Sequence, residues 1–390
     1  MKLISKILSV VLLSAISHTA TAIPFTFEGR SLGMGGVSVA TADLATAAWA
    51  NPAMLTNQRP TDDFSLLIGV GAMLRDDDDL ITDIQDFQDA DDRRKAAASG
   101  SAEALDAVLD MQAIIRGLED KIIAPEVSGV AAMGIAFDSF AMAVSIRGDV
   151  IAAGAVENTS KNIGDVTNED FNILNIEGVL ATEIGVSFAK DFQIYKKKVS
   201  IGIKPKVVDL QVFTARESII NASTGFDNLS EEDTQFHLGT FTTFDLGFAV
   251  DLSDSFRLGL SLRNLINDKF DVKGQTLNFD TEATIGIAYR NRFLTVAMDY
   301  DLIENEPLLS NPTFDGLKTQ YIAIGAEFNT FDIAQLRIGV SRNTAGSISD
   351  GAKDTALTAG IGFWLGFNLD IAATFRDNSI GGFVQTGFRF

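Results

Sequence analysis

Apolar and polar residues alternate along much of the second half of the chain. In residues 367–376, every second position is apolar, and polar or small side chains fill the others; the apolar positions are Phe367, Leu369, Ile371, Ala373 and Phe375. A period of two places successive side chains on opposite faces of a β-strand. The same pattern recurs in residues 244–251, 258–262, 285–289, 294–300, 322–328, 336–340 and 355–365. It predicts an all-β fold whose strands each have one apolar face.

The links between these strands fall into two length classes. Short links lie at residues 138–139, 252–254, 291–292, 330–332 and 365–366, with a looser one at 193–198. Longer polar links alternate with them, at residues 158–175, 217–235, 268–277, 304–317 and 344–354. Strands of about ten residues, with short turns at one end and long loops at the other, are typical of transmembrane β-barrels. A soluble β-sandwich also alternates, but it has no reason to sort its loops by length.

Counting strands by this rule gives about fourteen, an even number, as expected for a single-chain bacterial barrel. The predicted starts are residues 64, 127, 140, 177, 199, 236, 255, 279, 292, 318, 334, 355, 367 and 381. The final strand ends with an apolar face that resembles the strand recognised by the outer-membrane assembly machinery, formed by Gly382, Val384, Thr386, Phe388 and Phe390. We therefore predict an all-β, transmembrane antiparallel β-barrel of about 14 strands over residues 63–390.

The first 22 residues have the features of a secretory signal peptide. Lys2 and Lys6 form a short basic head, residues 7–16 are mostly apolar, and Ala20 and Ala22 flank an A-x-A cleavage site. The apolar run is too short to span a bilayer as a helix. We expect cleavage near Ala22 and export of the remainder. Together with the strand pattern, this predicts a location in the outer membrane of a Gram-negative bacterium, in contact with its lipid.

The composition removes several classes of function. The chain of 390 residues has no cysteine, which excludes thiol catalysis and thiolate metal sites. Its formal net charge of -21 argues against nucleic acid as a partner. The acidic run at residues 76–79 lacks the spacing of a calcium loop, so we interpret it as a solvated charge run. No cofactor and no metal are expected.

One insertion, residues 76–126, departs from the strand pattern. Ser101 is a candidate helix N-cap, and Glu103 lies in the first turn that would follow it. One helical face is apolar, made of Leu105, Val108, Met111, Ile115, Leu118 and Ile122. Strand parity places this insertion on the extracellular side. It could bind a protein partner, contact an amphiphilic ligand, or pack on neighbouring loops as a solvated ornament.

The polar face of the strands carries charges of both signs. They are Asp245, Asp251, Arg257, Arg263, Glu282, Asp299, Asp301, Glu327, Arg337, Asp370, Arg376 and Arg389. If the apolar face meets lipid, these side chains line the lumen, where charge is tolerated. We expect most of them to pair with one another or with whatever fills the lumen. A role in selectivity is the alternative for any one of them.

Before the first strand lies a glycine-rich stretch, residues 27–55. Gly33 and Gly35 match the start of a dinucleotide-binding fingerprint, but Ser38 stands where its third glycine should be, and no strand precedes them. Glycines at 29, 33, 35 and 36 instead permit close backbone approach. We predict that residues 23–62 form a hatch, or plug, in the lumen or on the periplasmic side of the barrel.

The same stretch resembles two families of outer-membrane barrel. Its Asn51-Pro52-Ala53 turn is similar to the plug of the FadL-type long-chain fatty-acid transporters. The arrangement of residues 30–36, Ala42-Asp43 and this turn resembles barrel-type conjugal-transfer TraF proteins more closely, as do residues 359–363 and 368–372. The resemblance implies a plugged barrel. It implies a hatch or gating role for Gly33, Gly35, Gly36, Trp49, Asn51, Pro52 and Ala53.

Three classes of function follow. The first is a passive FadL-type channel for hydrophobic or amphiphilic small molecules, gated by the hatch. The second is a non-transporting structural or interaction component of a conjugation or secretion apparatus, with a protein partner at the helical insertion. The third is an outer-membrane enzyme, for which His237 is the one candidate histidine base outside the signal peptide; without a G-x-S-x-G motif we expect no enzyme.

Overall fold

The computed structural model describes residues 28–58, 63–76, 79–118, 121–157, 159, 160, 162, 164–220, 234–266, 268–272, 275–305, 309, 310, 318–330, 333–345, 355–376 and 379–390. The expected signal peptide, residues 1–22, and the first residues of the predicted hatch lie outside the described residues. So do the side chains of residues 234–237, which include that of His237.

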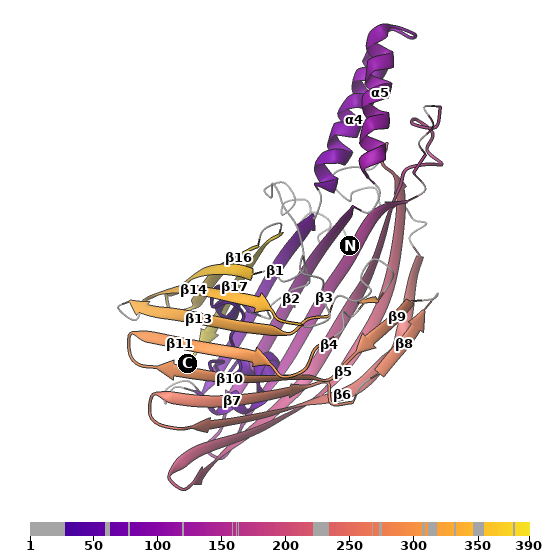
Figure 1. Cartoon of the computed structure of the whole chain (residues 1–390). Helices are drawn as coiled ribbons and strands as arrows, with labels where there is room; N and C mark the ends of the chain where they lie inside the picture. The colour runs from indigo at the N-terminus through magenta and orange to yellow at the C-terminus, as the bar shows by residue number, and fades with distance from the viewer. Residues whose placement is uncertain are drawn as a thin grey trace.

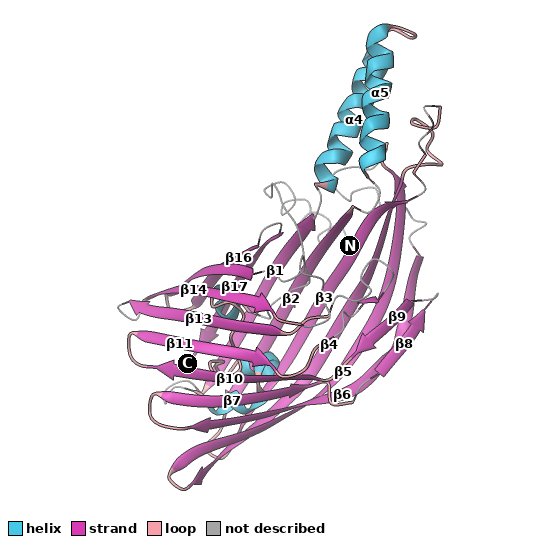
Figure 2. Cartoon of the chain, viewed as in Figure 1, coloured by secondary structure: helices cyan, strands magenta, loops and turns pink. Residues whose placement is uncertain are grey.

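Fourteen antiparallel strands close into a barrel (Figures 1 and 2). They are β1 Phe64–Asp76, β2 Ile122–Ala136, β3 Ala141–Glu157, β4 Ile173–Ile194, β5 Lys197–Ser218, β6 Thr234–Asp251, β7 Phe256–Arg263, β10 Glu282–Arg290, β11 Leu294–Asp301, β13 Tyr321–Thr330, β14 Ala334–Asn343, β15 Thr355–Trp364, β16 Asn368–Arg376 and β17 Ser379–Arg389. The first strand pairs with the last, and Phe64 N donates to Phe390 O at 2.9 Å. Closure pairs the edges that a membrane could not solvate. The predicted fold class is confirmed.

Several strands are longer than the ten residues expected from a single membrane crossing. Both β4 and β5 have 22 residues. The outward-facing side of β5 is apolar as far as Val207 and then carries Asp209 and Gln211. The strand pairing therefore continues beyond the apolar band, which the alternation alone did not reveal. Figure 1 shows β3, β4 and β5 rising above the shorter strands β7 to β17 towards the helices.

Two predicted links differ from their sequence-based description. The looser link at residues 193–198 is a two-residue turn in which Tyr195 and Lys196 have φ of 48° and 64°. Positive φ at both positions matches a type I′ hairpin turn, which usually contains glycine or asparagine, so the sequence signal was absent. The link at residues 268–277 forms a hairpin of β8 Asp268–Val272 and β9 Gln275–Phe279, extended by β12 Leu309–Ser310. These strands are too short to give a clear alternation.

The insertion between β1 and β2 is a helical hairpin of α4 Leu80–Ala96 and α5 Ala102–Gly117. Ser101 caps α5 as expected, and its side chain accepts a hydrogen bond from Ala104 N at 3.1 Å. The predicted apolar face is partly wrong, because Leu105 is 57% exposed and Ile122 belongs to β2. The buried residues are Ala107, Met111, Ile115 and Leu118, so the prediction is correct for the last three.

The acidic run before this hairpin is not merely solvated. The carboxylate of Asp76 accepts hydrogen bonds from Leu80 N at 2.7 Å and Ile81 N at 3.1 Å. These are two of the backbone donors that the first turn of a helix leaves without an intrahelical partner. The Asp76 carboxylate therefore caps the N-terminal end of α4, which corrects our interpretation of the run at this position.

The two faces of the barrel wall differ as the alternation predicts. On β14 and β15, Ile338 and Leu357 point outward and are 58% and 61% exposed, whereas Arg337 and Thr358 point inward and are 4% and 6% exposed. The even-numbered residues of β17 face outward as far as Phe390. None of the helices in the described part of the chain is long and apolar enough to cross a membrane.

A charge on the outward face should destabilise the barrel according to its depth. Ile338 lies near the middle of β14, so Ile338→Lys should lower the free energy of unfolding by about 2–4 kcal/mol. Ile333, which is 55% exposed in the turn before β14, is the matched control, and Ile333→Lys should cost about 0–1 kcal/mol. Denaturant unfolding in lipid vesicles measures both. Equal losses would contradict the assignment of this face to lipid.

Candidate functional site

Residues 28–58, which we call the inner segment, lie inside the barrel near the end that carries the short turns. The segment contains three short helices, α2 Gly29–Gly33, α3 Ala47–Ala50 and η1 Pro52–Thr56. Figure 2 shows helical turns enclosed by the lower parts of the strands. Most of its residues are buried, including Met34, Ala47 and Leu55 at 0% exposure. The segment therefore forms part of the core of the molecule.

Glycines give the inner segment its local shape. Helix α2 ends where Gly35 and Gly36 adopt φ of 77° and 100°, a region that favours glycine. Gly36 N donates to Ser31 O at 2.8 Å, which closes the helix in a left-handed cap. A side chain at Gly35 would also lie 2.8 Å from Val340 O on the wall. Gly33 also lies against the wall, because its added Cβ would be 3.0 Å from Gly360 Cα.

The barrel wall carries a matching belt of inward-facing glycines. A Cβ at Gly202 on β5 would lie 2.3 Å from the carbonyl carbon of Pro52, and one at Gly247 on β6 would lie 2.1 Å from Asn51 Oδ1. Further glycines approach the segment as closely: Gly259 meets Val39 O, Gly325 meets Met34 O and Gly339 meets Gly35 N, with added Cβ atoms at 2.6, 2.1 and 2.2 Å. The backbones of wall and segment are therefore in direct contact at positions where any side chain would overlap.

The Asn51-Pro52-Ala53 turn joins two parts of the inner segment to the wall. Asn51 Oδ1 accepts from Ala53 N at 3.1 Å, while its Nδ2 donates to Val39 O at 2.9 Å and to Phe248 O on β6 at 3.2 Å. Asn51 is completely buried, so each polar atom needs these partners. Pro52 starts η1, where its missing N–H costs nothing.

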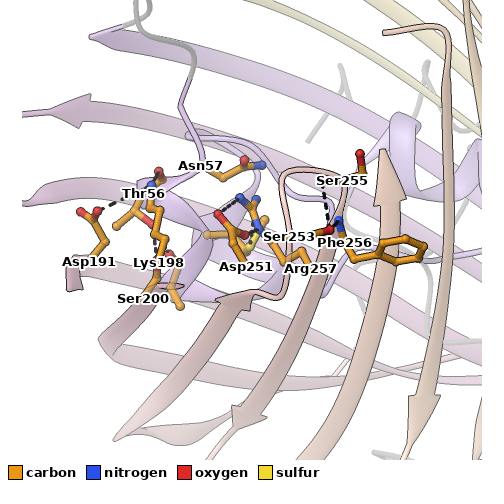
Figure 3. Close-up of polar contacts among 12 residues, drawn as sticks. Thr56, Asn57, Asp191, Lys198, Ser200, Asp251, Ser253, Ser255, Phe256 and Arg257 are labelled. Atoms are coloured by element: carbon orange, nitrogen blue, oxygen red, sulfur yellow. Dashed lines mark hydrogen bonds and ion pairs between the residues drawn. The ribbon is translucent and has the colours of Figure 1, made fainter. Parts of the chain in front are cut away.

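The end of the turn is tied to β5. Thr56 Oγ1 and Ser200 Oγ are 2.7 Å apart, and Lys198 Nζ donates to Thr56 O at 2.7 Å (Figure 3). On the neighbouring wall, Arg257 pairs with Asp251 at 2.5 Å, and its Nη1 approaches Met54 Sδ at 4.0 Å. Each of these polar contacts between η1 and the wall involves at least one side chain.

At its other end, the inner segment is held by an ion-pair network. The guanidinium of Arg30 binds both oxygens of Glu327 on β13, at 2.7 and 3.1 Å, and its Nη1 donates to Thr41 O at 2.7 Å. Arg337 on β14 also binds Glu327, at 2.8 Å, and reaches Asp370 on β16 at 2.5 Å. We call Arg30, Glu327, Arg337 and Asp370 the latch network.

Gln385 on β17 completes this network. Its Nε2 donates to Asp370 Oδ2 at 3.0 Å, and its Oε1 accepts from Gly29 N at 2.8 Å. Removing one partner from such a buried set costs about 3–5 kcal/mol, because it leaves the other charge without compensation. The latch network thus couples α2 to four strands of the wall.

A buried carboxyl lies beside the latch network. Glu28 is 3% exposed, and its Oε2 accepts no hydrogen bond from the part of the chain that the structure describes. Burial, reinforced by the nearby carboxylate of Asp43, raises the pKa of Glu28 to about 8. Most Glu28 side chains are therefore protonated at pH 7, which avoids placing an uncompensated charge in the core.

A family comparison agrees with this arrangement. The family model described as "F plasmid transfer operon, TraF, protein" matches residues 48–301, which contain the Asn51-Pro52-Ala53 turn and the strands from β1 to β11. The match covers more than half of the chain. The protein belongs to the TraF family.

Solved structures place this TraF-family chain among FadL-type folds. It is 14% identical to a Pseudomonas putida toluene transporter, TodX, over 94% of this chain and 99% of that one, with a TM-score of 0.56. The Ralstonia pickettii toluene transporter TbuX gives 14% identity, coverages of 94% and 98%, and a TM-score of 0.53. A Pseudomonas aeruginosa FadL homologue gives 13% identity, coverages of 95% and 99%, and a TM-score of 0.53. A comparison with curated protein sequences gives no match.

The structure brings the predicted hatch residues of this TraF-family chain together inside the barrel. Besides the glycines and the turn, Trp49 is 3% exposed and belongs to an apolar cluster with Leu32, Leu67 and Phe383. Asp299 on β11 accepts from Ser38 N at 2.7 Å and Val39 N at 2.9 Å. Its carboxylate therefore holds the middle of the inner segment.

Four of the other predicted charges, Asp245, Arg263, Glu282 and Arg376, lie on the inner face of the wall. Arg263 on β7 pairs with Glu282 on β10. Arg376 is 7% exposed at the far end of β16. Asp245 binds Lys206 Nζ at 2.9 Å.

Sequence reasoning missed the partners of Asp245. Lys206 also binds Glu183 at 2.8 Å, and Lys204, which is 1% exposed, pairs with the same carboxylate. The alternation of β5 could have identified both lysines as inward-facing. Among the described residues, no three His, Cys, Asp or Glu side chains are placed to hold a metal ion.

Overpacking the glycine belt should release the inner segment. In Gly202→Val the new side chain would displace the turn at Pro52, at a cost of about 1–3 kcal/mol, which shifts a docking equilibrium by roughly tenfold. Because the chain has no cysteine, Ala53→Cys, at a site of 0% exposure, supplies a single reporter thiol. Its maleimide labelling should be slow alone and roughly tenfold faster with Gly202→Val.

The control is Gly129→Val on β2, where an added Cβ meets no atom within 4 Å. It should leave the labelling rate of Ala53→Cys unchanged. Equal labelling in both double variants would mean that the belt does not position the segment.

Proposed function

We propose that this TraF-family barrel is an outer-membrane channel for hydrophobic or amphiphilic small molecules, and that residues 23–62 act as its hatch. The observation that carries the proposal is how the inner segment is held. It packs across the lumen, yet it joins the wall through side-chain hydrogen bonds and ion pairs rather than through a β-ladder. Such a plug can leave its seat without breaking the barrel.

The inner wall on the loop side of the segment suits an amphiphilic cargo. Glu183, Lys204, Lys206 and Asp245 form an ion-pair cluster on β4, β5 and β6. Beyond it, an apolar cluster follows along the same strands, made of Val179, Val208, Leu210, Val212 and Phe241. A polar and an apolar zone therefore succeed each other along one wall, which is favourable for a molecule with a polar head and an apolar body.

The proposed location follows from the loop lengths. With the short turns in the periplasm, both the inner segment and Phe390 lie on the periplasmic side, and the α4–α5 hairpin is extracellular. A signal peptide cleaved near Ala22 would supply the export that this location needs. The names of the similar solved proteins, toluene transporters among them, support a hydrophobic cargo. The expectation that the chain is not an enzyme stays a prediction.

Deleting the plug tests this function. Removal of residues 25–55 should raise the conductance of the protein in planar bilayers, because the lumen loses the segment that occupies it. Replacement of residues 80–117 by a short linker is the control and should leave the conductance unchanged. Unchanged conductance after deletion of residues 25–55 would contradict a hatch that closes a channel.

The alternative is a non-transporting component of a conjugation or secretion apparatus. The α4–α5 hairpin favours this alternative, because the hairpin projects away from the barrel (Figure 1) and packs on the strand ends at its base. Phe87, Met111 and Ile115 pack there with apolar residues of the strand ends. Lys121 Nζ binds Asp83 at 2.6 Å, and Gln88 Nε2 donates to Ile219 O at 3.1 Å. Outward on α5, Leu105 and Leu109 are 57% and 47% exposed.

This alternative predicts a protein partner that co-purifies with the tagged chain through residues 76–126. Leu105→Asp with Leu109→Asp should abolish the co-purification, because it places charge in the apolar contact. Thr82→Asp with Gln85→Asp adds the same charge to exposed positions of α4 and should leave it intact. Specific co-purification that survives both pairs would move the contact elsewhere.

A further inference from the structure

The hairpin of β4 and β5 extends beyond its neighbour at the turn end of the barrel. Ala189 pairs with Ala141, the first residue of β3, and β4 then continues through residues 190–194. Figure 1 shows this turn below those of β6–β7 and β10–β11. We call residues 188–201 the β4–β5 tip. Beyond Ala189, no residue of β3 pairs with β4, so the side chains of residues 190–194 lie at the edge of the apolar band.

The outward face of the tip continues the lipid-facing rows of both strands. Phe188, Phe192 and Ile194 on β4 are 41%, 43% and 48% exposed, and Ile201 on β5 is 43% exposed. Lys190 lies in the same row, and its Nζ is 5.7 Å from the centre of the Phe192 ring. Lysines within apolar rows at a membrane edge extend their ammonium groups to the headgroup layer.

The charge of the tip is opposite to that of the chain. It carries four lysines, at positions 190, 196, 197 and 198, and a single acid, Asp191, whereas the whole protein has a formal charge of -21. Lys198 is engaged inward with Asp191 at 3.8 Å and with Thr56 O at 2.7 Å. The other three lysines are exposed, and Lys197 donates to Leu252 O. No described carboxylate forms an ion pair with any of these three.

The turn itself retains large side chains where small ones would fit better. Tyr195 and Lys196 hold φ of 48° and 64°, a conformation that glycine and asparagine adopt at less cost. Tyr195 is 96% exposed, so packing does not explain its presence. An exposed aromatic and a lysine at a membrane edge match the composition of interfacial anchors.

We propose that the β4–β5 tip is a binding site for the phosphate headgroup of an anionic phospholipid. Lys190, Lys196 and Lys197 would contact the phosphate, and Phe192, Ile194 and Tyr195 would contact the glycerol region and the upper acyl chain. Two observations identify this occupant: continuity with the lipid-facing rows and a positive charge unmatched by nearby carboxylates. The assignment of this site to the periplasmic leaflet rests on the proposed outer-membrane location, whereas the preference for an anionic headgroup does not.

The test measures which lipid stays with the full-length protein. The chain is reconstituted in equal parts of phosphatidylglycerol and phosphatidylethanolamine, extracted with mild detergent, and the retained lipids are quantified. Wild type should retain an excess of phosphatidylglycerol. The variant K190Q/K196Q/K197Q should lose that excess. Each lysine removed should lower the preference for phosphatidylglycerol over phosphatidylethanolamine by roughly fivefold. K190R/K196R/K197R keeps the charge and should retain the excess.

The matched control R93Q/K95Q/R116Q removes the same charge from exposed positions of α4 and α5 and should behave as wild type. The proposal is overturned if wild type retains both lipids equally, or if the control loses the excess as fully as the tip variant. It is also overturned if the tip, crosslinked in cells through a reporter at Tyr195, attaches to a periplasmic protein instead of lipid. Because none of these variants alters the inner segment, their outcome is independent of the conductance test of the hatch.

Discussion

The direct contact between the backbone of the inner segment and the glycine belt of the wall is the constraint on which the rest of the structure depends. With added Cβ atoms only 2.1–2.3 Å from the segment at Gly202, Gly247, Gly325 and Gly339, the fit leaves no room for side chains. Van der Waals contact over such a surface excludes water from the polar groups beneath it. The buried amide of Asn51 and the carboxylate of Asp299 can then find their partners only in the docked arrangement.

The latch network depends on the same fit. Arg30 reaches Glu327 because α2 lies directly against β15 and β16, and the pair is shielded from solvent. A buried pair of this kind contributes little to net stability compared with apolar packing, but it is costly to break halfway. The latch network therefore fixes α2 in one position on the wall and adds little to the net stability. The raised pKa of Glu28 favours the same arrangement, because an ionised Glu28 would compete with Glu327 and Asp370 for Arg30 and Arg337.

The alternation of apolar and polar residues, together with the alternation of short and long links, was sufficient to predict the barrel. It predicted fourteen strands and their outward faces because membrane and lumen impose opposite solvents on alternate residues. It could not predict the length of β4 and β5, since strand pairing continues where the outer face is no longer apolar. The α5 face was misassigned at Leu105 because apolar residues lie on more than one side of this helix. The packing against α4 decides which of them are buried, and it buries Ala107 instead.

The site was harder to predict than the fold. The Asn51-Pro52-Ala53 turn and the segment glycines were visible in the sequence, but the wall positions that they contact, such as Gly202 and Gly360, lie about 150 to 330 residues away. No local pattern connects Gly247 to Asn51, and a glycine on the lumenal face looks the same whether it faces water or a plug. Lys204 and Lys206 were missed for a related reason, because their partners come from two other strands.

Whether the inner segment leaves its seat is the central question, and a reversible crosslink answers it directly. Thr56 Oγ1 and Ser200 Oγ are 2.7 Å apart, so Thr56→Cys with Ser200→Cys places two thiols within bonding distance in a chain that has no other cysteine. Uptake of a hydrophobic solute such as toluene into proteoliposomes should fall to the protein-free rate on oxidation and return on reduction. Undiminished uptake through the fully crosslinked protein would contradict a moving hatch.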